Sequence, residues 1–286
     1  MQIVTPDPSW IVGKHALMNL HAVKRNGRTE IDPRRWRIPF QWQGTHYQDN
    51  DDQPFLLLIN SGGGFVEGDA AQLCGSLDPG TRALITTTAA SKFYKCLEGQ
   101  VSREIVDLEV GPGALLEYCP DESIPFAQSR VERSIRLRLL GDARLFATDI
   151  IAAGRVHHAA GEAFAFESLV AEFAVEIDGE TAVLDRIEAR DAAQVKDLEA
   201  LWGGASHLAT VICRGDSLPG DVESRLETAV TGVDLRSFGA SRVDDGLVVC
   251  RVLADEAWLC QEAVLACWGV VRPSLAGKAA RPIRKC

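Results

Sequence analysis

The sequence predicts a mainly β fold. Three stretches have large apolar side chains at every second position: Val106-Asp107-Leu108-Glu109-Val110 and the ranges 135–139 and 173–177, with charged residues or Ala174 between them. Turn signals such as Gly141-Asp142 separate these stretches. Half-buried strands joined by tight turns produce this pattern. Because strands do not alternate with helices between residues 55 and 190, a Rossmann-type sheet is disfavoured.

The first part of the chain begins with a predicted hairpin. An apolar stretch at 14–23 is followed by Asn26-Gly27, a dipeptide strongly preferred in tight hairpin turns. The acidic, polar segment 48–53 is predicted to be an exposed loop. A buried strand at 55–59 then runs into three glycines, and a second buried strand ends in three threonines at 86–88.

Helices are expected mostly in the C-terminal third. The pattern predicts helices at 191–202, at 222–230 with Asp221 as the N-cap, and at 255–268, with Pro273 as a stop signal. A strand is expected at 247–253. Trp258, Leu265 and Trp268 fall on one stripe of the last helix, and Cys260 and Cys267 also share a face, where packing is favoured over chelation.

The glycine-rich segment does not fit a nucleotide-binding loop. A Walker loop ends in Gly-Lys-Ser/Thr, whereas Gly68 here precedes Asp69. A dinucleotide fingerprint requires Gly-x-Gly-x-x-Gly at the start of a helix, and the spacing from Gly64 to Gly68 is one residue too long. The glycines instead allow positive φ angles and a close approach of the backbone.

Four sequence blocks extend along the chain in a fixed order. They are Gly63-Gly64-Phe65-Val66-Glu67-Gly68-Asp69, Thr86-Thr87-Thr88-Ala89-Ala90-Ser91-Lys92-Phe93-Tyr94, Leu116-Glu117-Tyr118-Cys119-Pro120-Asp121-Glu122-Ser123-Ile124-Pro125-Phe126, and Gly154-Arg155 with Gly161-Glu162. The set resembles the signature of the UreD/UreH-type urease accessory proteins, with Thr88 in place of the family's glutamine. The candidate motif or interface residues are therefore Gly63, Gly64, Gly68, Thr86, Thr87, Lys92, Tyr94, Glu117, Pro125, Phe126 and Arg155.

The resemblance implies a fold and a function. Proteins of this type fold as a two-layered, β-helix-like stack of strands with few helices, a refinement that periodicity alone does not provide. We expect one UreD-type domain over residues 1–286, with flexible ends at about 1–12 and 273–286. The implied function is that of a urease maturation factor without enzymatic activity. It would act with a UreF-type protein and a UreG-type GTPase to deliver nickel into apo-urease. No tightly bound cofactor is expected, only transient nickel.

Composition limits the other classes of partner. The net charge of −10 argues against a nucleic-acid-binding protein, which is normally basic. No apolar run approaches the ~20 residues of a membrane span, and the N-terminus does not resemble a signal peptide. The eight cysteines form no Cys-x-x-Cys pair, so we interpret them as buried, reduced thiols of a cytoplasmic protein.

Carboxylates within or next to the blocks suggest a route for a cation. Asp69, Glu122, Asp149 and Glu162 are the candidate residues of a hydrated nickel path, because oxygen ligands bind a divalent cation loosely and release it. The alternative is that these side chains, with Glu117, form salt bridges to Lys92, Arg144 or Arg155.

The histidines and the absence of a hydrolase motif leave other interpretations open. His15 and His21 share a strand face and are interpreted as structural, with a metal pair as the alternative. His157 and His158 are candidates for metal or catalytic work. Two alternative functions are considered: a β-helix-like hydrolase that uses paired carboxylates, and a scaffold that never binds metal.

The C-terminal segment is basic in an acidic protein. Residues 272–286 contain no acidic side chain, which suggests a docking segment or a flexible end. Arg272 and Gly277 fit the closing pattern of the family, whereas residues 281–286 depart from it. The helix at 255–268 and this segment are the candidates for exposed apolar surface that meets a partner.

Overall fold

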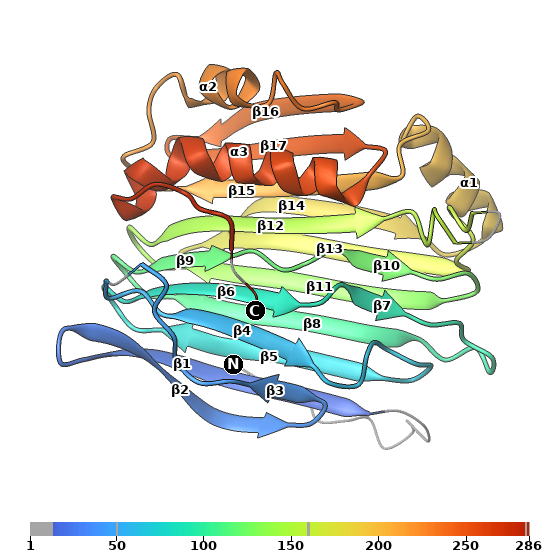
Figure 1. Ribbon diagram of the computed structural model, residues 1–286, viewed down its shortest axis with the longest axis horizontal. Helices are drawn as coiled ribbons and strands as arrows, with labels where there is room; N and C mark the ends of the chain where they lie inside the picture. The colour runs from blue at the N-terminus through green and yellow to red at the C-terminus, as the bar shows by residue number, and fades with distance from the viewer. Residues whose placement is uncertain (1–13, 50, 159–160, 284, 286) are drawn as a thin grey trace.

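Two stacked β-sheets form the body of the molecule in this computed structural model (Figure 1). The structure describes residues 14–49, 51–158, 161–283 and 285. The predicted flexible segment 1–12 therefore lies outside the described residues. Within them, sheet I has the strand order β14 (Glu180–Ala189), β13 (Ser168–Ile177), β11 (Arg130–Leu139), β8 (Ser102–Val110), β5 (Ala70–Leu77), β1 (His15–Arg25) and β2 (Arg28–Arg37).

Sheet II lies over sheet I. Its strand order in the described chain is β16 (Ser237–Asp244), β17 (Leu247–Ala254), β15 (His207–Arg214), β12 (Arg144–Ala152), β9 (Leu115–Tyr118), β6 (Arg82–Thr88), β4 (Phe55–Asn60) and β3 (Phe40–Trp42). The short strands β7 (Ser91–Phe93) and β10 (Ser123–Pro125) pair with each other beside this path. The strands expected at 55–59 and 247–253 and the one ending at 86–88 are confirmed.

The chain alternates between the two sheets from β4 to β13. Each passage through both sheets forms one rung, and successive rungs pair in parallel. In sheet I, β5 pairs with β8 and β8 with β11; in sheet II, β4 pairs with β6 and β6 with β9. In β8, Val106, Leu108 and Val110 are buried between the sheets, whereas Asp107 and Glu109 point away. The predicted two-layered, β-helix-like stack is confirmed.

The two ends of the rungs differ. At one end the chain returns from sheet I to sheet II through tight turns, in which Gly80, Gly113 and Gly141 have φ angles of +68°, +66° and +55°. The opposite end carries longer loops that lead from sheet II to sheet I (Figure 1). The predicted hairpin precedes these rungs, and Asn26 and Gly27 form its turn with positive φ angles.

Three helices within the described residues complete the fold, and each lies where a helix was predicted, although the last one extends further. They are α1 (Ala192–Leu201), α2 (Val222–Ala229) and α3 (Ala257–Ala276). The Asp191 carboxylate accepts hydrogen bonds from the backbone of Ala193 and Gln194 and so caps α1. Asp221 makes no such capping bond; its carboxylate pairs with Arg225 at 2.8 Å.

The expected end of the last helix was wrong, and of the predicted stripe only Trp258 is exposed, whereas Leu265 and Trp268 pack against sheet II. α3 continues past Pro273 and ends at Gly277, whose φ is +73°. The buried contacts of Arg272 and Leu275 hold this last turn, although proline removes one backbone hydrogen bond. Trp258 is 58% exposed rather than packed. The face that contacts sheet II contains Leu259, Cys260, Ala263, Cys267, Trp268, Val271 and Leu275, so most of α3 is not exposed apolar surface.

The thiols have the environment predicted for them. The seven described cysteines are free and buried. Burial raises the pKa of the Cys74 thiol to about 11 and that of Cys260 to about 12. Both therefore stay protonated near neutral pH. No helix in the described part of the chain is long and apolar enough to cross a membrane.

A buried ion pair attaches α3 to sheet II. Glu117 is completely buried and accepts hydrogen bonds from the Arg272 guanidinium at 3.0 and 3.1 Å, from Trp268 Nε1 at 2.6 Å and from Gln53 Nε2 at 2.7 Å. Arg272 also contacts Asp49 at 3.2 Å. Gln48 is exposed as its polarity predicted, but Asp49, Asp51 and Asp52 are half-buried and Gln53 is buried, so the exposed loop expected at 48–53 is wrong for these four residues. The buried Glu117 and Arg272 side chains require the Gln53 amide and the Asp49 carboxylate as partners.

We expect Arg272→Met to lower the free energy of unfolding by about 3–5 kcal/mol, because it leaves the Glu117 carboxylate buried without a cation. Arg225→Met, which removes an exposed ion pair on α2, should cost less than about 1 kcal/mol. Urea-induced unfolding of both variants measures the difference. Adding Glu117→Gln to Arg272→Met should recover part of the lost free energy of unfolding. If Arg272→Met and Arg225→Met lower the free energy of unfolding equally, the buried-pair interpretation is contradicted.

Candidate functional site

The sequence blocks come together at the long-loop end of the rungs. The loops 61–69, 94–101, 126–129 and 153–167 each connect a strand of sheet II to a strand of sheet I. Because successive rungs pair in parallel, these loops occupy equivalent positions and lie next to one another on the right-hand side of Figure 1. Residues that are distant in the sequence thus form one surface.

Backbone hydrogen bonds join the first three loops. The amide of Phe65 donates to the carbonyl of Lys92 at 2.7 Å, and the amide of Tyr94 donates back to the carbonyl of Phe65 at 2.8 Å. Phe126 donates to the carbonyl of Phe93 at 2.9 Å. Gly64 lies so close that a Cβ there would be 2.6 Å from the Lys92 carbonyl oxygen. Its φ of +145° and this contact explain why a glycine is needed.

Side chains continue the connection to the fourth loop. The Tyr94 hydroxyl donates to the Gly63 carbonyl at 3.2 Å, and its ring meets Phe126 edge-on with centroids 5.0 Å apart. The Arg155 guanidinium lies 4.2 Å above the Phe126 ring. Arg155 also donates two hydrogen bonds to Glu162, at 2.7 and 2.5 Å, and these lower the pKa of that carboxyl. The motif residues therefore hold the four loops in one arrangement.

The predicted carboxylate Asp69 is an anchor for the backbone. It is buried and accepts hydrogen bonds from the amides of Lys14 at 2.6 Å and Val66 at 3.0 Å. These contacts close the turn at Gly68, whose φ is +76°. The alternative partner Lys92 forms no ion pair with a described residue.

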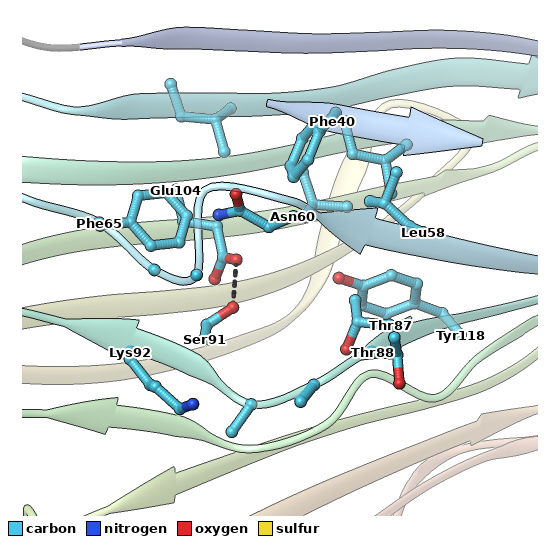
Figure 2. A pocket seen from close by; sticks show the side chains of 17 residues that line it. Phe40, Leu58, Asn60, Phe65, Thr87, Thr88, Ser91, Lys92, Glu104 and Tyr118 are labelled. Atoms are coloured by element: carbon cyan, nitrogen blue, oxygen red, sulfur yellow. Dashed lines mark hydrogen bonds between the residues drawn. The ribbon is translucent and has the colours of Figure 1, made fainter. Parts of the chain in front are cut away.

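A cavity of about 80 Å³ lies between the sheets, next to this end. Figure 2 shows Asn60, Thr87, Thr88, Ser91, Lys92, Glu104 and Tyr118 around it. Thr87 accepts a hydrogen bond from the Asp121 amide at 2.8 Å, and buried Thr86 donates to the Cys119 carbonyl at 2.5 Å. Burial raises the pKa of the Tyr118 phenol, which therefore stays neutral.

A hydrogen-bonded series of charged side chains begins at Glu104, which lines the cavity. Ser91 donates to Glu104 at 2.9 Å, and Arg133 contacts both Glu104 at 2.9 Å and Asp149 at 2.9 and 3.0 Å. Sequence reasoning missed Glu104 and Arg133. The signal was available, because both occupy the core-facing positions of alternating strands, where Val106 and Ile135 are their apolar neighbours on the same face.

The four proposed path residues occupy separate places. Asp69 caps its turn, Asp149 pairs with Arg133, and Glu162 pairs with Arg155. Among the described residues, the Glu122 carboxylate accepts a hydrogen bond only from the Gln261 side-chain amide of α3, at 3.1 Å. The described residues contain no group of three or more histidine, cysteine or acidic side chains arranged to hold a metal ion. The nickel path stays a prediction.

The histidines have separate acidic partners. His21 contacts Asp78 at 2.7 Å, and His157 contacts Glu256 at 2.8 Å. His158 lies 4.0 Å from Glu162. Within the described chain, these pairs do not assemble into a metal centre. Each of these histidines is observed next to a single carboxylate.

Comparison with known proteins identifies the family. The sequence model described as "UreD urease accessory protein" matches residues 14–285. The chain belongs to the UreD family of urease accessory proteins. Curated relatives named urease accessory protein UreD include one from Pseudomonas paraeruginosa, 30% identical over 285 residues and 99% of each chain. Another, from Klebsiella pneumoniae, is 27% identical over 93% of this chain and 92% of its own.

The UreD-type carboxylate Asp69 allows a test of its anchoring role. We expect Asp69→Asn to lower the free energy of unfolding by about 1–3 kcal/mol, because an amide cannot accept both backbone hydrogen bonds as a carboxylate does. Asp216→Asn, at an exposed position, is the matched control. Urea unfolding and urease nickel content should be measured on the same variants. Unchanged stability with reduced nickel would contradict the anchoring role.

Proposed function

We propose that this protein is a non-catalytic urease maturation factor that helps deliver nickel into the apo-urease active site. The observation that carries the proposal is the match to the UreD family over residues 14–285. The names of the relatives, urease accessory protein UreD, support the connection to urease. In this proposal the partners are a UreF-type protein, a UreG-type GTPase and apo-urease, in the cytoplasm.

The geometry of the long-loop end supports a docking role. Its four sequence blocks form backbone contacts, ring packing and the Arg155–Glu162 pair, and do not present an exposed catalytic group among the described residues. Loops held together by such contacts have few alternative conformations in the free protein. Less conformational entropy is therefore lost when a partner binds. We therefore assign the binding of the accessory partners to this end.

Nickel handling in this proposal is transient. Carboxylate oxygens and water bind divalent nickel less tightly than thiolates and imidazoles do, so they release it readily. Asp149 and Glu162 would have to exchange an arginine partner for the cation. Glu122 has no cationic partner among the described residues, and it lies where β10 meets α3. It is therefore the first of the four carboxylates to test.

A scaffold that never contacts metal is the second candidate. It is favoured by the arrangement of the carboxylates, since Asp69, Asp149 and Glu162 are each engaged by backbone amides or an arginine. A scaffold and a nickel carrier differ in one respect: only the carrier should lose nickel delivery when an acidic side chain is neutralised without loss of assembly.

Deletion of the gene should leave urease folded and abundant but poor in nickel and in activity. Urease purified from the deletion strain should regain both when the gene is restored. Metal analysis and activity per mole of urease measure the effect. Full activity and nickel content in the deletion strain would exclude a role in maturation.

Glu122→Gln should reduce the nickel content of urease while the accessory complex still assembles, because it removes one negative charge and keeps the side-chain size. Glu262→Gln, an exposed position on α3, is the matched control. Pull-down yield, thermal stability and urease nickel should be measured on both variants. Normal nickel with Glu122→Gln would support the scaffold instead.

A further inference from the structure

The last strand of sheet I has an open edge. β2 pairs with β1 on one side only, and no other described strand pairs with its opposite side (bottom of Figure 1). Residues 34–38 are exposed without interruption, and Trp36 and Ile38 are 59% and 71% exposed. Edge strands present unpaired backbone N–H and C=O groups that another extended chain can use.

A β-bulge places three arginines on one side of this edge. The register between β1 and β2 pairs Asn19 with Arg35 but Leu20 with Pro33, so Arg34 is the extra residue. Arg34 contacts the Nδ1 atom of His21 on the outer face of sheet I. Arg35 is opposite Asn19 and Arg37 is opposite Leu17 on that same outer face.

The arginines at the end of this edge lack acidic partners within the described part of the chain. Arg35 and Arg37 form no ion pair with a described residue. Elsewhere on the outer face of sheet I arginines are paired, as Arg103 is with Glu132 at 2.8 Å and Arg136 with Glu176 at 3.4 Å. A basic row with no acidic partner among the described residues, on a protein of net charge −10, is complementary to an acidic ligand.

The edge is continuous with the candidate functional site. Directly after β2, the Pro39 carbonyl accepts a hydrogen bond from the Ser61 amide at 3.0 Å. A Cβ on Gly62 would lie 3.3 Å from the Pro39 ring. The basic edge therefore leads into the first motif loop, and a partner bound there would also be next to the long-loop end.

We propose that residues 34–38, which are the end of β2 and the residue after it, bind an extended acidic segment of a partner protein by strand addition. Backbone pairing would extend sheet I by one strand, Arg34, Arg35 and Arg37 would attract the acidic side chains, and Trp36 and Ile38 would bury apolar surface. Like charges disfavour a second copy of this basic edge at the same place, whereas an acidic strand is attracted.

The test uses a fluorescent peptide of alternating Glu and Val with the full-length protein, followed by anisotropy at low and high salt. The peptide should bind at low salt and more weakly at high salt, because exposed charge pairs are screened. Arg35→Glu with Arg37→Glu should weaken binding by about tenfold or more. Arg225→Glu with Arg281→Glu changes the net charge equally at exposed positions elsewhere and should leave binding unchanged.

A peptide of the same sequence with alternate backbone nitrogens methylated separates strand addition from simple charge attraction. It keeps every carboxylate but cannot form the ladder of hydrogen bonds on the methylated side, so it should not bind. Equal binding of this peptide, or equal weakening by the control variant, would overturn the proposal. Tighter, Arg35- and Arg37-dependent binding of a poly-uridine oligonucleotide would also overturn it. Circular dichroism confirms that the variants are folded.

Discussion

The alternation of the chain between two sheets is the constraint on which the rest of the structure depends. Each rung must return to its starting sheet, so neighbouring strands run in parallel and their connections accumulate at two ends. Tight glycine turns occupy one end, and longer loops occupy the other. The four sequence blocks meet because each includes residues at the long-loop end of its own rung. Close contacts such as that of Gly64 with Lys92 then fix the spacing between loops.

Two groups of buried acidic side chains are compensated by arginines. Glu117 with Arg272, and Asp149 with Glu104 and Arg133, are satisfied by hydrogen bonds in the two apolar cores. Burial of such pairs contributes little net stability, but removal of one partner is strongly unfavourable. These groups therefore specify where α3 and the rungs sit. They also show that an acidic residue in a family block can serve the fold, as Asp69 does.

Two parts of the surface differ in their physical character. The long-loop end is interlocked by backbone bonds, ring contacts and an ion pair, whereas the edge of β2 has exposed arginines and an unpaired backbone. A rigid surface suits a partner with a preformed shape, and an open edge suits an extended segment. Because Pro39 and Ser61 join the two regions, partners bound at both would be neighbours.

The sequence by itself determined the strands, the hairpin turn at Asn26-Gly27 and the order of the motif blocks, because period-two patterns and turn residues are local signals. Its alternating pattern also places Glu104 and Arg133 on the core-facing side of their strands. Only the tertiary structure decided the partners of the charges. The polarity of segment 48–53 predicted an exposed loop, yet Gln53 is buried against Glu117. The stop at Pro273 likewise failed, because burial of Arg272 and Leu275 outweighed one lost hydrogen bond. These outcomes depend on packing between residues that are far apart in the sequence, and local sequence patterns do not encode such contacts.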